Sequence, residues 1–161
     1  SSRMLQLVKQ GETELAFVNL PVSDDELCIE PCLKIHDIFV CGAEHNIKPS
    51  YTMEEIANEP LILLETKSTS RRFVDEQFLK NDIRLAPQIE IASHDLLLMF
   101  ASIHLGVSCV IREFSKESLE SGAVCEMNLN PPLPHRSIGC AYLKHNPLSK
   151  PAQAFLELIR G

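Results

Sequence analysis

Three hydroxyl residues in succession, Ser68, Thr69 and Ser70, follow Lys67 at the point where an apolar strand over residues 61–64 gives way to a helix. A helix N-terminus presents free N–H groups and a partial positive charge, which suits a carboxylate or another small anion. Each hydroxyl could instead simply cap its own helix, but three exceed what capping needs. Arg71 and Arg72 oppose the helix dipole, so they either face an anion or lie on an ion-paired surface. Both interpretations stay open at this stage.

The remaining polar residues form no catalytic, metal-binding or cofactor-binding pattern. There is no HxH or HExxH spacing, no GxSxG, no GxGxxG and no P-loop. His94 and Asp95 are adjacent and so point in different directions on a helix. His94 follows Ser93 at a helix start and could line a cleft, but a helix surface is favoured. The histidines are scattered through the chain, at His36, His45, His94, His104, His135 and His145. We therefore expect no enzyme, no metal and no cofactor.

Composition narrows the class of protein. The 161 residues include 15 Lys and Arg and 22 Asp and Glu, which gives a net charge of −7. This negative charge repels phosphate backbones and disfavours binding of nucleic acid by this chain itself. No apolar run reaches the length of a membrane span, and no basic-then-apolar signal segment opens the sequence. The six cysteines sit in apolar, strand-like stretches without a CxxC pair, which indicates reduced, mostly buried thiols and a cytoplasmic location.

The order of expected elements defines the fold class. A helix over 1–9 ends before Gly11, and strands follow at 15–19, 27–35 and 38–41, with Pro31 marking an edge or a bulge. Strands and helices alternate from residue 50 onward, which predicts an α/β fold with sheets covered by helices on both faces. These later elements are a helix from the Thr52 capping box, strands at 61–64, 89–92, 107–111, 124–129 and 138–143, and helices at 71–80, 93–106 and after Ser149. The 93–106 helix is apolar nearly all round and is expected to be deeply buried.

A family resemblance appears once these residues are laid out. Residues 11–21, GETELAFVNLP, resemble a segment of the effector-binding domain of LysR-type transcriptional regulators. The resemblance continues in the same order through residues 89–93, 105–108, 121–124, 132–136 and 151–156. Two positions depart from the family pattern: Glu14 stands where Asp is usual, and His104 stands where Gly is preferred.

The resemblance implies a two-lobed fold of the type 2 periplasmic-binding-protein kind. Regulatory lobe I would comprise residues 1–47 and 143–161, without the family's first strand, helix and second strand, and lobe II would comprise residues 48–142. The chain would then be N-terminally truncated, with the DNA-binding winged helix-turn-helix of the parent protein lying earlier still. A homodimer or tetramer is also implied.

The resemblance further implies where an effector would bind, between the two lobes. Ser1, Ser2 and Asn19 would face the effector from lobe I, and Lys67, Ser68, Thr69 and Ser70 from lobe II. The implied function is a ligand-sensing domain that alters DNA binding by the parent protein. A solute-binding protein of a transport system is the alternative on the same kind of fold, and the free thiols favour the sensor.

The expected cytoplasmic location leads to a prediction about the thiols. Quantitative labelling after denaturation without reductant should find all six cysteines free in freshly purified protein from a reducing cytosol. Two or more missing thiols in such material would contradict it.

Overall fold

The computed structural model describes residues 2–43 and 46–160, which fall into two compact units. Unit 1 combines the two ends of the chain, residues 1–35 and 136–161, and unit 2 is the continuous stretch 36–135. The sequence-based lobes change over after residues 47 and 142. The sequence-based lobes place residues 36–47 in lobe I and residues 136–142 in lobe II, whereas the compact units group these residues the other way round.

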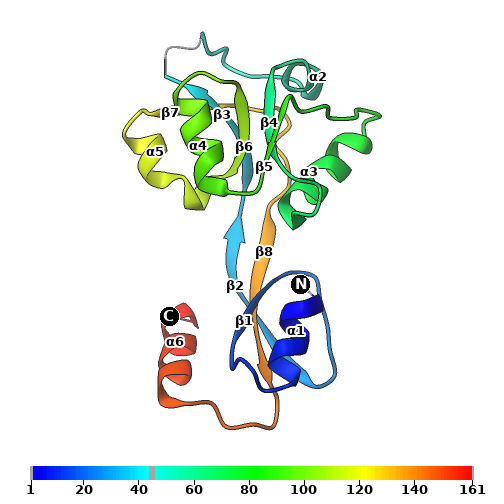
Figure 1. Cartoon of the computed structure of the whole chain (residues 1–161), viewed down its shortest axis with the longest axis vertical. Coiled ribbons are helices and arrows are strands. Elements are labelled where there is room, and N and C mark those ends of the chain that lie inside the picture. Colours follow the sequence, from blue (N-terminus) through cyan, green and yellow to red (C-terminus); the bar gives the residue numbers. More distant parts are fainter. Residues whose placement is uncertain (1, 44–45, 161) are drawn as a thin grey trace. The chain divides into compact units, whose positions relative to one another are not determined.

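Unit 1 is a three-stranded antiparallel sheet with a helix packed on one face (Figure 1). The strand order is β1-β8-β2, so β8 is central. The elements are α1 (Ser2–Lys9), β1 (Ala16–Asn19), β2 (Leu27–Ile35), β8 (Arg136–Leu143) and α6 (Lys150–Arg160). The buried residues beneath α1 are Val8, Ala16, Val18, Leu27 and Ala141. The apolar stripe of α1 therefore closes one face of this small sheet.

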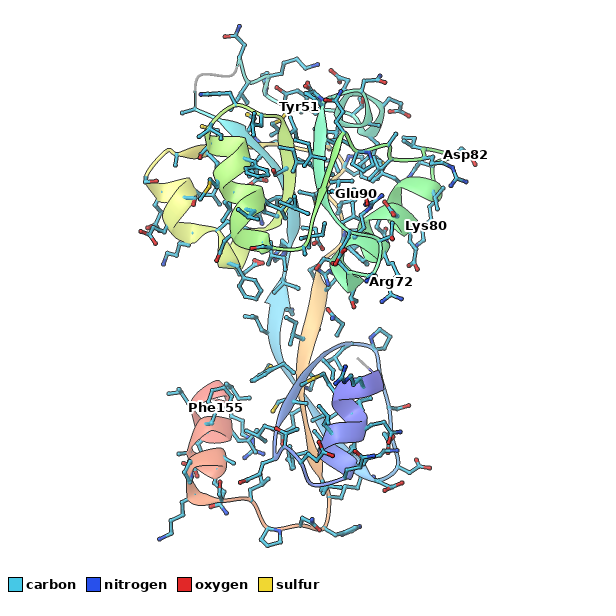
Figure 2. The ribbon with its side chains drawn as sticks, in the orientation of Figure 1. Tyr51, Arg72, Lys80, Asp82, Glu90 and Phe155 are labelled. Carbon is cyan, nitrogen blue, oxygen red and sulfur yellow. The ribbon has the colours of Figure 1, made fainter. Side chains whose placement is uncertain are left out.

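The second helix of unit 1, α6, is held by side-chain contacts to strands β1 and β2. Phe155 of α6, labelled in Figure 2, meets Phe17 edge-to-face with ring centroids 5.6 Å apart. Arg160 at the end of α6 donates from Nε to the Glu30 carboxylate of β2 at 2.9 Å. The expected irregularity at Pro31 is confirmed, because the register of β2 against β8 shifts between Pro31 and Leu33.

Unit 2 is a mixed five-stranded sheet in the order β5-β4-β6-β3-β7, with helices on both faces (Figure 1). Strands β5, β4 and β6 run parallel, and β3 is antiparallel to both β6 and β7. The strands are β3 (Asp37–Gly42), β4 (Leu61–Leu64), β5 (Ile89–Ile91), β6 (Val107–Ile111) and β7 (Val124–Met127). The helices are α2 (Met53–Ala57), α3 (Thr69–Leu79), α4 (His94–Ser102) and α5 (Lys116–Glu120), with a 3-10 turn at Arg112–Phe114.

The unit 2 sheet has a separate apolar core on each face. Phe39 lies on the face covered by α2 and α3, where it packs against Phe78 with ring centroids 5.8 Å apart. Val40 lies on the opposite face with Leu97 and Ala101 of α4. This alternation along β3 explains why all six of its residues are buried.

The expectation that the 93–106 helix is buried all round is wrong. Only Leu97 and Ala101 of α4 are fully buried, whereas Met99 is 54% exposed and Ile103, just past the helix, is 57% exposed. The helix covers one face of the sheet and leaves an apolar stripe in solvent. In α3, Val74 and Phe78 are buried against the sheet, whereas Leu79 is exposed.

The end of α4 shows how His104 replaces the usual glycine. His104 has φ 64°, the left-handed conformation that glycine adopts without cost. Its imidazole covers Gly42, where an added Cβ would lie 2.3 Å from Nδ1. The helix therefore ends as a glycine-terminated helix would, at a cost of about 1 kcal/mol in backbone strain.

Within residues 2–43 and 46–160, no helix combines the length and apolarity needed to cross a membrane.

The packing of α3 generates a stability prediction with a matched control. Phe78 is 0% exposed and Leu79, its neighbour, is 47% exposed. Phe78→Ala should lower the free energy of unfolding by about 3–5 kcal/mol through lost burial and a residual cavity. Leu79→Ala should change it by roughly 0.5 kcal/mol or less. Urea unfolding followed by circular dichroism measures both, and equal losses would contradict this account of α3.

Candidate functional site

The first turn of α3 carries four of the predicted effector residues. Ser68 is the N-cap residue, and its Oγ accepts a hydrogen bond from the Arg71 backbone N–H at 3.3 Å. Thr69 and Ser70 are half-buried at the first two helical positions, and Lys67 is exposed. Capping therefore uses one of the three hydroxyls.

Arg71 anchors this turn to the sheet. Its buried guanidinium donates from Nε to both carboxylate oxygens of Asp75 at 3.0 Å, and from Nη1 to the Leu64 carbonyl at 2.8 Å. Nη1 also reaches Glu90 Oε1 of β5 at 3.3 Å. Arg71 is thus ion-paired within unit 2, which is one of the two interpretations left open by the sequence. Arg72 is exposed and projects outward, with Nη2 donating to the Lys67 carbonyl at 3.2 Å (Figure 2).

A narrow cavity lies beside this turn, within unit 2. Its walls come from the carboxyl ends of β4 and β6, the start of β3, and the N-terminal turns of α3 and α4. The polar side chains among the lining residues are Asp37, Ser70, Arg71 and His94. The carboxyl edge of parallel strands is where ligands bind in open α/β sheets. The space measures about 20 Å³, room for a single water-sized group, so unit 2 alone does not enclose a metabolite.

His94, the first residue of α4, is a lining residue that the sequence placed on a helix surface. Its Nε2 accepts a hydrogen bond from the Ile111 backbone N–H at 3.0 Å, and its ring meets Phe114 edge-on at 6.2 Å. Because Nε2 is the acceptor, the proton of the neutral ring sits on Nδ1. Burial lowers the pKa of His94, against smaller opposing effects of Asp95 and Asp37, so the ring is neutral near pH 7.

The predicted site residues belong to both units. Lys67, Ser68, Thr69 and Ser70 lie together in unit 2, and of these Ser70 lines the cavity. Asn19 lies in unit 1, where its Oδ1 accepts from Arg136 Nη1 at 2.9 Å. Ser2 is the first residue of α1, and Ser1 lies outside the described residues. Their role in binding an effector stays a prediction.

Sequence reasoning considered His94 as a cleft residue but favoured a helix surface, although the signal for the cleft was present. A polar residue directly after a strand and at a helix start marks both Ser70 and His94, because β4 leads into α3 and β5 leads into α4. The burial of Asp37 and of Arg71 was not predicted, for a different reason. Their burial depends on which strands pair, and the sequence alone does not fix that pairing.

Two of the histidines expected to be scattered come together. The rings of His36 and His135 lie 6.1 Å apart, and His36 Nδ1 lies 3.1 Å from Glu113 Oε1. His45 lies outside the described residues. Among the residues described, no group of three or more His, Cys, Asp or Glu side chains is arranged to hold a metal ion.

The two α/β units, with polar helix N-termini at the carboxyl edge of a sheet, define a domain of the small-ligand-binding class. The family model of the LysR substrate binding domain matches residues 1–161, and the chain belongs to this family. Its fold is the type 2 periplasmic-binding-protein-like fold of LysR effector-binding domains.

Two of the relatives that this chain matches are transcriptional regulators about twice its length. The chain is 23% identical over 158 residues to the uncharacterized HTH-type transcriptional regulator YeiE of Escherichia coli K12, covering 98% of this chain and 54% of that protein. It is 26% identical over 161 residues to the HTH-type transcriptional activator CmpR of Synechocystis, covering 98% and 52%. The chain thus spans about half the length of these relatives.

Solved structures share the fold. The CcmR regulatory domain of Synechocystis PCC6803, in complex with 2-PG, superposes with a TM-score of 0.82 at 18% identity, covering 98% of this chain and 76% of that one. The effector-binding domain of QuiR, in complex with shikimate, superposes with a TM-score of 0.79 at 19% identity, covering 99% and 76%.

The half-buried His94 generates a pH prediction. Its pKa in the folded chain lies below the ordinary 6.5, so the unfolded chain binds the proton more readily. The stability that His94 contributes is present above about pH 6.5 and is lost as the pH falls through its lower folded pKa. His94→Gln keeps an acceptor for the Ile111 N–H and cannot titrate, so it should lose less stability than wild type between about pH 8 and pH 5.5. Urea unfolding at both pH values tests this, and identical losses would refute it.

Proposed function

We propose that this chain is the ligand-sensing regulatory domain of a LysR-type transcription factor. It binds a small, anionic effector between two lobes, which correspond to unit 1 and unit 2, and the bound effector alters DNA binding by the parent protein. The observation that carries the proposal is the cavity at the carboxyl edge of the unit 2 sheet, where α3 and α4 both begin.

The chemistry of that edge supports a small anion or a polar group bearing hydrogen-bond acceptors. Helix α3 directs its N-terminus there, and Thr69 and Ser70 supply hydroxyls beyond the one that caps the helix. Lys67 supplies an exposed cation beside them, whereas the charge of Arg71 is already balanced by Asp75 and Glu90. Affinity therefore depends on hydrogen bonds and helix N–H groups together with Lys67.

The small volume of the cavity supports a shared site. Because unit 2 offers space for only a water-sized group, we assign the rest of the effector surface to Ser1, Ser2 and Asn19 of unit 1. An effector that contacts both lobes shifts their closure equilibrium only through its difference in affinity for the open and closed states. The complexes of CcmR with 2-PG and of QuiR with shikimate support a small-molecule effector for this chain.

The remaining parts of the proposal concern the intact regulator. DNA contact comes from an N-terminal winged helix-turn-helix of the parent protein, since the chain itself carries a net charge of −7. The parent acts in the cytoplasm without catalysing a reaction. It forms a homodimer or tetramer, for which the exposed apolar stripe of α4, formed by Leu96, Met99 and Ile103, offers a contact surface.

A pair of matched substitutions tests the site. The effector is first sought by thermal shift among small carboxylates, phosphate and sulfate. Thr69→Val keeps the volume but leaves an effector oxygen unpaired, which should weaken binding roughly tenfold to a hundredfold in calorimetric titration. Folding stability should change little, because Ser68 still caps α3.

Thr66→Val is the control, the same substitution at an exposed position just before the cap. It should bind the effector as wild type does. Equal affinities of Thr69→Val and wild type would reject the assignment of this turn to the effector site.

A further inference from the structure

Three thiols lie on one face of the unit 2 sheet, and two of them lie outside the lining of the proposed effector site. Cys41 of β3, Cys109 of β6 and Cys125 of β7 all pack on the side covered by α2 and α3. Only Cys109 lines the cavity described above. Cys41 and Cys125 differ from the other cysteines because they are direct partners across the antiparallel β3·β7 ladder.

The ladder geometry places this pair within reach of a disulfide. Directly opposed residues of antiparallel strands have Cα atoms about 4.5–5.5 Å apart and project their side chains to the same face. A disulfide needs a Cα separation of about 4.4–6.8 Å. The Cys41 Sγ lies 3.8 Å from the Cys125 carbonyl oxygen, so the Cys41 side chain already leans toward β7.

The two thiols differ in their exposure. Cys41 is 2% exposed, whereas Cys125 is only half-buried on β7, the edge strand of the sheet. Burial and the neighbouring Cys125 raise the pKa of Cys41 to about 11, so it remains a protonated thiol. A small oxidant from solvent therefore meets Cys125 first, with Cys41 held behind it as a second thiol.

We propose that Cys41 and Cys125 form a redox-modification site at which hydrogen peroxide produces a cross-strand disulfide. The Cys125 thiolate attacks one peroxide oxygen, the O–O bond breaks, and hydroxide leaves, so that Cys125 becomes a sulfenic acid. The Cys41 sulfur then attacks the Cys125 sulfur, the S–O bond breaks, and the hydroxyl leaves with the Cys41 proton as water. Two thiols are oxidised by two electrons, and one peroxide is reduced to two waters.

The disulfide gives the domain an input that is separate from its effector. It joins residues 84 positions apart and fixes the edge strand β7 to β3. Strand β3 begins just after the chain enters unit 2, and β7 is the last strand before the chain leaves it. Oxidation therefore fixes the first and the last strand of unit 2 to each other, and reduction by a thiol releases them.

Two other thiol pairings compete with this one and make the site testable. Cys109 of β6 lies opposite Phe39 of β3, two residues along the strand from Cys41. In unit 1, Cys32 lies at the irregular position of β2, and Cys140 is buried on β8. Neither pairing has the direct cross-strand register of Cys41 with Cys125.

The experiment treats the reduced 161-residue chain with a small excess of hydrogen peroxide, alkylates the remaining thiols and maps peptides by mass spectrometry. We expect a Cys41–Cys125 cross-linked peptide that has lost two hydrogen atoms and disappears on reduction. Cys41→Ala should stop at a Cys125 sulfenic acid that dimedone traps, and Cys125→Ser should give neither product. Cys109→Ser is the control and should cross-link as wild type does.

A second measurement uses only the wild-type protein, so it does not depend on whether the variants fold. Phenylarsine oxide, which bridges two neighbouring thiols, should protect Cys41 and Cys125 together from alkylation. After peroxide treatment the pair should no longer bind phenylarsine oxide but should still resist alkylation until it is reduced. Peroxide products confined to Cys109, to a Cys32–Cys140 pair or to sulfinic acid at Cys125 would overturn the proposal, as would full alkylation of Cys41 and Cys125 after peroxide.

Discussion

The buried guanidinium of Arg71 links three elements at the carboxyl edge of the unit 2 sheet. It joins the last carbonyl of β4 at Leu64, the Glu90 carboxylate of β5 and Asp75 one turn along α3. Removing the guanidinium would take a hydrogen-bond partner from the Leu64 carbonyl and from Asp75, whereas the exposed Glu90 carboxylate would be solvated. These contacts attach the first turn of α3, which carries Ser70, to β5 and to β4, which forms another wall of the cavity.

The local elements could be predicted from the sequence because their signals are local. Thr52 and Glu55 form the predicted capping box, Gly11 follows α1 with φ 74°, and Ser149 accepts from the first turn of α6 at 3.3 Å. The burial of α4 could not be predicted, because the sequence of an apolar helix does not show whether one side of the helix or all of it packs against other elements. The sheet supplies only one neighbour, so Met99 stays exposed.

The candidate site likewise has residues that the sequence identified and residues that only the strand pairing brings together. The hydroxyls of the α3 turn are visible in the sequence because they lie next to one another, and their effector role remains a prediction. His94, Asp37 and Arg71 meet around the cavity only through the parallel pairing of β4 with β6 and the antiparallel pairing of β6 with β3. The facing of Cys41 and Cys125 likewise depends on strand register, which no short-range pattern in the sequence encodes.

The interrupted layout of unit 1 has a consequence for the order of folding during synthesis. Unit 2 is one continuous stretch, and all its strands have been made once residue 127 leaves the ribosome. Unit 1 has a three-stranded sheet whose central strand, β8, is made last. Until residues 136–143 emerge, β1 and β2 have no strand between them and the apolar residues beneath α1 remain uncovered. Unit 2 can therefore complete its sheet before unit 1 does, and residues 1–35 wait for β8 while chaperones can reach them.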